Sequence, residues 1–299
     1  MNSSLEVLKK IYKPYRYTIK GNVVILYTTS KDLVVKKKND KNISETYRYL
    51  KSRGFYNFPE IVDDSRDGVN VFEYIEDTKM PKEQKASDLI NVISSLHNKT
   101  TYYKVVSDDV FKSIYDSIKS NIDYLEYYYE SLVNNIKKIE YPSPSEYLII
   151  RNSSKIFSCL NFCKSELNNW FDLVKDENKQ RVSLIHNNLS LSHFIKSDKE
   201  YLVSWDKSKI DSPVLDLIIF YDSSYFDLDF KTLFDMYQSK YPLTESEKKL
   251  FFINISLPKK IEIKTSEFDT CIEVRKTLDY LFKTESLVRP YYSIENKDK

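Results

Sequence analysis

The stretch LIHNNLSLSHFI, residues 184–195, sets polar side chains inside the apolar frame of a catalytic loop. Its chemical groups are the imidazoles of His186 and His193 and the amides of Asn187 and Asn188. Imidazole exchanges protons near neutral pH and binds metals, whereas an amide forms hydrogen bonds but has no basic carboxylate. The stretch is therefore compatible with an active site, a former active site or a loop that only shares the pattern.

The elements before this loop have the order of a small β-rich region. Residues 16–38 contain three runs of β-branched and aromatic residues, separated by Gly-Asn and Lys-Asp turn pairs, and they predict three strands. Residues 42–53 have the apolar spacing of a helix that ends at Gly54. A hairpin around Asp67 and Gly68 then leads to another strand.

From about residue 87 the apolar periodicity becomes mainly helical. It predicts helices over residues 87–100 and 107–138, and a further helix whose capping box SPSE is framed by Ser143 and Glu146. Short strands follow within residues 182–206, and a helical tail completes the chain. This order predicts an α+β protein with a β-rich N-terminal region, residues 1–77, a mainly helical C-terminal region, residues 78–292, and a disordered tail, residues 293–299.

The composition narrows the range of partners. Lys+Arg number 46 and Asp+Glu number 44, so the formal charge of +2 creates no global field that would attract nucleic acid. We read the basic run at residues 36–41 as solvated surface, with a phosphate-binding surface as the alternative. The N-terminus has no apolar signal region, and no apolar run approaches the roughly 20 residues that a membrane span needs. We therefore expect a cytoplasmic protein without a membrane partner.

The order of elements over roughly residues 15–285 resembles the aminoglycoside phosphotransferase/choline kinase family, which includes kinase-like spore-coat proteins. The resemblance implies the bilobal protein-kinase-like fold, with a small β-rich N-terminal lobe and a larger, mainly helical C-terminal lobe. In such enzymes a lysine of the third strand holds the phosphates of ATP and pairs with a glutamate of the next helix. The resemblance assigns these nucleotide-binding positions to Lys36 and Glu45, although both residue types are commonly found on surfaces. Because neighbouring strand residues point to opposite faces, only one of Lys36 and Lys37 can face the cleft.

The family's catalytic loop reads H-G-D-x-x-x-x-N, and its metal motif follows a short strand. In the sequence HNNLSLSH, His186 matches the histidine that supports the loop, Asn188 matches the catalytic aspartate and His193 matches the metal-binding asparagine. The segment LVSWD places Asp206 at the metal-binding aspartate. The segment DSPVLDL matches a later family segment whose last aspartate, here Asp216, is structural.

Three departures from the family pattern change the expected chemistry. Asn188 lacks the basic carboxylate that accepts the proton of the acceptor, a loss that typically costs about 10²–10⁴ in rate. Imidazole is a poor ligand for Mg²⁺, so His193 is an unsuitable replacement for the asparagine. The Gly-Asn turn after residue 20 is too short to cover a triphosphate. As an alternative, His186, His193 and Asp206 could hold a softer metal as three ligands.

These departures predict an aminoglycoside phosphotransferase-like protein with a degenerate catalytic loop. We expect a pseudokinase-type binding or scaffold protein with an unidentified protein partner or small-molecule ligand, in which ATP and Mg²⁺ bind weakly or no longer bind. One alternative is an active ATP-dependent phosphotransferase that acts on a small-molecule hydroxyl or amine. The other alternative is a spore-associated structural protein.

Overall fold

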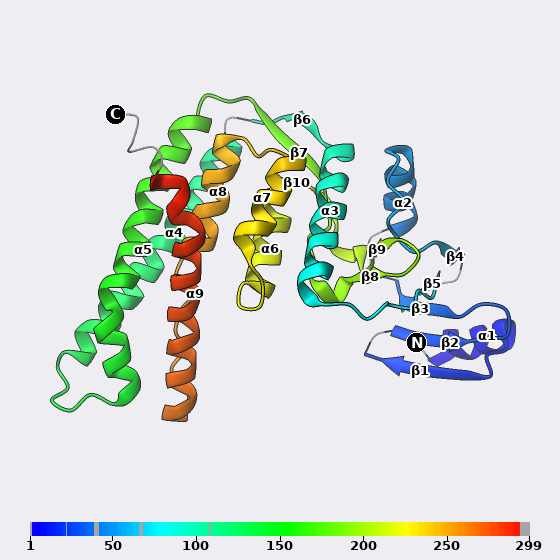
Figure 1. The fold of residues 1–299 in the computed structure, drawn as a ribbon, viewed down its shortest axis with the longest axis horizontal. Coiled ribbons are helices and arrows are strands. Elements are labelled where there is room, and N and C mark those ends of the chain that lie inside the picture. The colour runs from blue at the N-terminus through cyan, green and yellow to red at the C-terminus, as the bar shows by residue number, and fades with distance from the viewer. Residues whose placement is uncertain (1, 22, 39–41, 66–67, 108, 294–299) are drawn as a thin grey trace. The chain divides into compact units, whose positions relative to one another are not determined.

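The computed structural model describes residues 2–21, 23–38, 42–65, 68–107 and 109–293 (Figure 1). Contacts divide the chain into two compact units. The first unit contains residues 1–101, 183–211 and 239–241, and the second contains residues 102–182, 212–238 and 242–299. The predicted boundary between two lobes at residues 77 and 78 is a different division of the chain and stays a prediction.

An antiparallel five-stranded sheet in the order β1-β2-β3-β5-β4 forms the base of the first unit. Its strands are β1 (Arg16–Lys20), β2 (Val23–Tyr27), β3 (Leu33–Lys37), β4 (Ile61–Asp63) and β5 (Val69–Glu73). Val35 pairs with Val24 on one side and with Val71 on the other, and directly opposed residues share a face of the sheet. Helix α1 (Asn2–Tyr12) packs Leu8 against this apolar layer.

Helices and short strands complete the first unit. Helix α2 (Ile43–Ser52) begins at Asn42, whose side chain accepts the backbone N–H of Glu45, and Gly54 follows it with the left-handed φ of +70°. Helix α3 (Lys82–Thr100) comes next in this unit. The strands β8 (Phe194–Lys196) and β9 (Glu200–Leu202) form a hairpin, and β10 (Lys209–Asp211) pairs with the last residues of β7 (Lys179–Ile185).

The second unit is mainly helical. It contains β6 (Tyr102–Val105), α4 (Asp109–Ile136), α5 (Pro144–Val174), α6 (Val214–Ser224), most of α7 (Phe230–Lys240), α8 (Glu245–Ser256) and α9 (Glu267–Ser293). Helix α5 packs against α4, α8 and α9 and buries a continuous stripe of side chains. The stripe consists of Ile156, Leu160, Cys163, Leu167 and Trp170, which recur at helical spacing in the sequence.

The predicted α+β class, with a β-rich N-terminal region and a mainly helical C-terminal region, is confirmed. The capping box at Ser143 is also present, and it begins α5 as predicted. Parts of the predicted turns, basic run and tail, at residues 22, 39–41, 67 and 294–299, lie outside the described residues. Among the helices that the structure describes, none has both the length and the apolar character needed to cross a membrane.

Candidate functional site

Lys36 and Asp206 meet at the wall of a cavity of about 400 Å³ in the first unit. Along β3 the side chain of Lys36 is half-buried, whereas that of Lys37 is exposed. The ammonium group of Lys36 forms an ion pair with Oδ2 of Asp206 and lies 3.5 Å from Oγ of Ser204. The strand alternation therefore turns Lys36 toward the cavity, whose volume is within the usual range for small-molecule and cofactor sites.

A tight turn of the backbone positions the carboxylate of Asp206. Ser204 adopts a left-handed conformation with φ of 66° and ψ of 51°, which is uncommon for a residue other than glycine. The next residue, Trp205, is fully buried, and its indole N–H donates to the carbonyl of Leu202 at 2.8 Å. The buried indole fixes the turn, so that Ser204 and Asp206 both line the cavity.

The loop after β7 is tied to the segment that precedes Asp206. His186 is fully buried, and its Nε2 donates to the carbonyl of Val203 at 2.8 Å. The N–H of Val203 donates to the carbonyl of His193 at 2.9 Å, and Nδ2 of Asn187 donates to the carbonyl of Lys207 at 3.0 Å. His186 is thus placed to hold the loop, and its assignment to a position of the catalytic loop stays a prediction.

Asn188 and His193 interact with each other through the backbone. Nδ1 of His193 donates to the carbonyl of Asn188 at 2.7 Å, so in the neutral ring the lone pair is on Nε2. The side-chain amide of Asn188 is half-buried and forms no hydrogen bond with another described residue. Neither residue is part of the cavity wall, to which this loop contributes Ser192. Their assigned roles in catalysis and metal binding stay predictions.

The carboxylate of Asp206 has one oxygen without a hydrogen-bond partner among the described residues. Oδ2 of Asp206 is paired with Lys36, whereas Oδ1 is buried and accepts a hydrogen bond from no described residue. A buried acceptor without a partner is energetically unfavourable, and carboxylate oxygen is a preferred ligand of Mg²⁺. A magnesium ion bound through Asp206 is therefore chemically compatible with the site.

The alternative three-ligand metal site is not formed. The ring centroids of His186 and His193 lie 6.2 Å apart, and Nε2 of His186 is used by the carbonyl of Val203. Within the described parts of the chain, no group of three histidine, cysteine, aspartate or glutamate side chains could hold a metal ion. The hypothesis of a site made of His186, His193 and Asp206 is therefore wrong.

Glu45 does not pair with Lys36. Its side chain is exposed and accepts from Nδ2 of Asn42 at 3.0 Å, while its backbone N–H donates to Oδ1 of Asn42 at 3.3 Å. The expected lysine–glutamate pair is replaced by the Lys36–Asp206 pair, because Glu45 is engaged in capping its own helix. A role of Glu45 in nucleotide binding stays a prediction, although the expected pair with Lys36 is not formed.

Two cavity residues were not predicted from the sequence. Ser204 carries no sequence signal, since serine gives no indication of a left-handed conformation. Tyr47 lies among the apolar residues of α2, and its spacing predicts only a buried helix face. Burial raises the pKa of Tyr47, and the negative charge of Asp206 raises it further. Tyr47 therefore remains a neutral hydroxyl group at the cavity.

The structure is similar to those of known phosphotransferases. It matches a crystal structure of an aminoglycoside phosphotransferase from Alicyclobacillus acidocaldarius with a TM-score of 0.69 and 10% identity, over 95% of this chain and 93% of that chain. A spectinomycin phosphotransferase bound to AMP matches with a TM-score of 0.54 and 14% identity, over 100% of this chain and 95% of that chain. The same kind of enzyme in complex with ADP and spectinomycin matches with a TM-score of 0.53, 11% identity and coverage of 95% and 98%.

Comparisons of sequence identify no relative. No family model matches the chain, and no curated protein matches it. At 10–14% identity the structural similarity establishes the fold, so the predicted protein-kinase-like fold of the aminoglycoside phosphotransferases is confirmed. The further resemblance to spore-coat proteins stays a prediction.

Proposed function

We propose that the first unit binds ATP together with Mg²⁺ and that the protein acts as a pseudokinase-type binding module with little phosphotransfer. The observation that carries the proposal is the Lys36–Asp206 pair at the cavity wall, with the second oxygen of Asp206 buried and unsatisfied. Solved structures of the same fold that are described as complexes with AMP or ADP support the choice of ligand.

Each residue has a distinct part in this proposed binding. The ammonium group of Lys36 would neutralise phosphate oxygens, and Asp206 would hold Mg²⁺ through its carboxylate. When bound, the ion would neutralise charge on the phosphates. Asn188 would not accept the proton of an acceptor hydroxyl group, because an amide has no basic carboxylate. The protein would thus still bind ATP but would transfer its phosphate inefficiently.

Calorimetry of ATP binding with and without Mg²⁺ tests the proposal. Wild type is expected to bind ATP more tightly with Mg²⁺, and Lys36→Ala is expected to weaken binding by about tenfold or more, as for the loss of a charge-assisted hydrogen bond. Asp206→Ala is expected to remove the dependence on Mg²⁺. The matched control is Lys37→Ala, which changes the neighbouring exposed lysine on the same strand and should leave binding unchanged.

Two results would contradict this function. Absence of binding at millimolar ATP would exclude the nucleotide and leave a scaffold that binds other molecules. Transfer of the γ-phosphate to a small hydroxyl or amine acceptor at about 1–100 s⁻¹ would instead identify an active kinase. That second function, an ATP-dependent small-molecule phosphotransferase, is favoured by the retention of both Lys36 and Asp206 at the cavity.

A further inference from the structure

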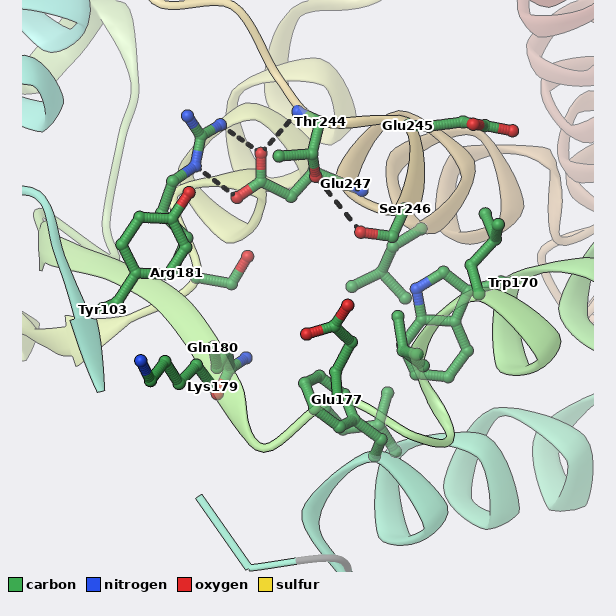
Figure 2. A pocket seen from close by; sticks show the side chains of 16 residues that line it. Tyr103, Trp170, Glu177, Lys179, Gln180, Arg181, Thr244, Glu245, Ser246 and Glu247 are labelled. Atoms are coloured by element: carbon green, nitrogen blue, oxygen red, sulfur yellow. Dashed lines mark hydrogen bonds and ion pairs between the residues drawn. The ribbon is translucent and has the colours of Figure 1, made fainter. Parts of the chain in front are cut away.

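A separate cavity of about 340 Å³ lies within the second unit (Figure 2). Residues of β6, α4, α5, β7 and the first turns of α8 form its wall, together with Glu177, Ser212 and Thr244. The apolar part of the wall consists of Phe111, Ile114, Leu173, Val174 and Leu250. None of the residues assigned above to nucleotide or metal binding belongs to this wall, so the cavity requires its own explanation.

Trp170 presents an unused hydrogen-bond donor to this cavity. The residue is 2% exposed, and its ring packs edge-on against Phe111 with the centroids 6.3 Å apart. Its indole nitrogen points into the cavity in Figure 2 and donates to no residue that the structure describes. This N–H faces the cavity and is not paired within the described residues, so it can donate to an acceptor atom of a ligand.

The start of α8 also contributes residues and backbone N–H groups to the cavity wall. In its capping box, Oγ of Thr244 accepts from the N–H of Glu247 at 3.2 Å, and the N–H of Thr244 donates to Glu247 at 2.9 Å. The N–H groups of Glu245 and Ser246 donate to no described residue, as is usual in the first turn of a helix. With the indole of Trp170, these groups form an array that suits a carboxylate.

The carboxylate of Glu177 favours a positively charged ligand group, whereas the donors described above favour a negatively charged one. Figure 2 shows its carboxylate pointing inward, toward Trp170 and Ser246, whereas Glu245 points away. The charge of Glu247 is already compensated, since Nε of Arg181 donates to it at 2.9 Å and a second nitrogen of the same side chain also pairs with it. A simple anion would be repelled by Glu177, and a simple cation would leave the donors unused. A zwitterion satisfies both sides.

We propose that this cavity binds a free α-amino acid with an apolar side chain. Its carboxylate accepts from the indole of Trp170 and from the first-turn N–H groups of Glu245 and Ser246. Its ammonium group donates to Glu177, and its side chain packs against the apolar part of the wall. This site shares no wall residue with the cavity lined by Lys36 and Asp206, so either proposal can fail without affecting the other.

Three related probes test the two charged ends separately. L-Leucine carries both ends, leucinamide lacks the carboxylate and 4-methylpentanoate lacks the ammonium group. We expect saturable binding of L-leucine by calorimetry, with each analogue weaker by about tenfold or more. The chain has only two tryptophans, Trp170 and Trp205, so a change in tryptophan fluorescence that disappears in Trp170→Phe locates the ligand.

Variants assign the ends to particular residues. Trp170→Phe keeps an aromatic ring against Phe111 but deletes the donor, and Glu177→Gln removes the charge of the acceptor. Both are expected to weaken L-leucine binding by about tenfold. Asp176→Asn is the matched control, because this neighbouring carboxylate is exposed and does not belong to the cavity wall. Because Glu177 is exposed, its variant tests the site even if Trp170→Phe does not fold.

Several outcomes would overturn the assignment. Absence of saturation by L-leucine would do so, as would equal binding of L-leucine and either analogue. Binding of glucose without binding of L-leucine would assign the cavity to a neutral polyol instead. Unchanged affinity in both Trp170→Phe and Glu177→Gln would show that L-leucine binds elsewhere on the chain.

Discussion

Lys36 and Asp206 bring opposite charges together in a partly buried wall, where the two residues depend on each other. Asp206 compensates the lysine through one oxygen while the other oxygen remains buried without a hydrogen bond. Pairs of this kind stabilise a fold little in themselves, but removal of one partner leaves a charge that is neither paired nor fully hydrated. The pair is thus better suited to receive a ligand than to stabilise the fold.

Asp206→Asn tests this dependence in the absence of nucleotide. We expect the variant to lower the free energy of unfolding by about 1–3 kcal/mol, since the lysine loses its counter-charge while retaining some solvent contact. A double-mutant cycle with Lys36→Met, followed by urea denaturation, isolates the coupling between the two side chains. A coupling within about 0.3–0.5 kcal/mol of zero would show that the pair is energetically unimportant.

For single residues, the sequence predicts which side chains line the cavity better than it predicts which side chains pair with one another. Lys36 and Asp206 follow from the resemblance to phosphotransferases and do line one cavity. The partner expected for Lys36 was Glu45, which instead contributes to the start of its own helix. Ser204 could not be predicted, because its left-handed backbone is imposed by the buried indole of Trp205 and not by its own preference.

At the scale of elements, helix-capping residues made the start of one helix predictable, whereas the shortest strands could not be predicted from the sequence. Ser143 and Glu146 have the spacing of a capping box, and α5 begins there as predicted. The strands β6 and β10 have only four and three residues, and both are stabilised by pairing with β7, which lies far from them in sequence. Such strands lack the period-2 run on which sequence prediction depends.

The cap of α5 provides a prediction at this scale. Ser143→Ala removes the side chain that accepts from the N–H of Glu146, and we expect a loss of about 1 kcal/mol in the free energy of unfolding. Ser153→Ala, within the same helix, is the matched control and should cost much less. Equal effects of the two variants in urea denaturation would show that the cap contributes nothing specific.

The chain contains 25 tyrosines, and burial raises the pKa of several of them in both units. Burial raises the pKa of Tyr201 and of Tyr221 to about 12, one in each unit. Burial likewise raises the pKa of Tyr129 and Tyr280. Since the unfolded chain ionises its tyrosines near pH 10, the folded state holds more protons above that pH.

The protein is therefore expected to lose stability in alkali. The contribution of the neutral tyrosines is complete below about pH 10 and is lost as the pH rises from there through about 12. Tyrosinate absorbance and circular dichroism, followed together against pH, should show that the last tyrosines ionise as the helices unfold. Ionisation of all tyrosines near pH 10, with native dichroism retained, would contradict the expectation.

Tyr221→Phe assigns a share of this effect to one residue. Tyr221 is 1% exposed, and its hydroxyl group lies 2.7 Å from that of Thr284. The variant has no ionisable hydroxyl group at this position. The slope of the free energy of unfolding against pH should therefore be less steep by about 1.4 kcal/mol per pH unit between pH 10 and 12. Tyr127→Phe, at a side chain that is 72% exposed, should leave the slope unchanged. If both variants keep the wild-type slope, the alkaline transition has another origin, and burial of Tyr221 does not limit the stability of the second unit.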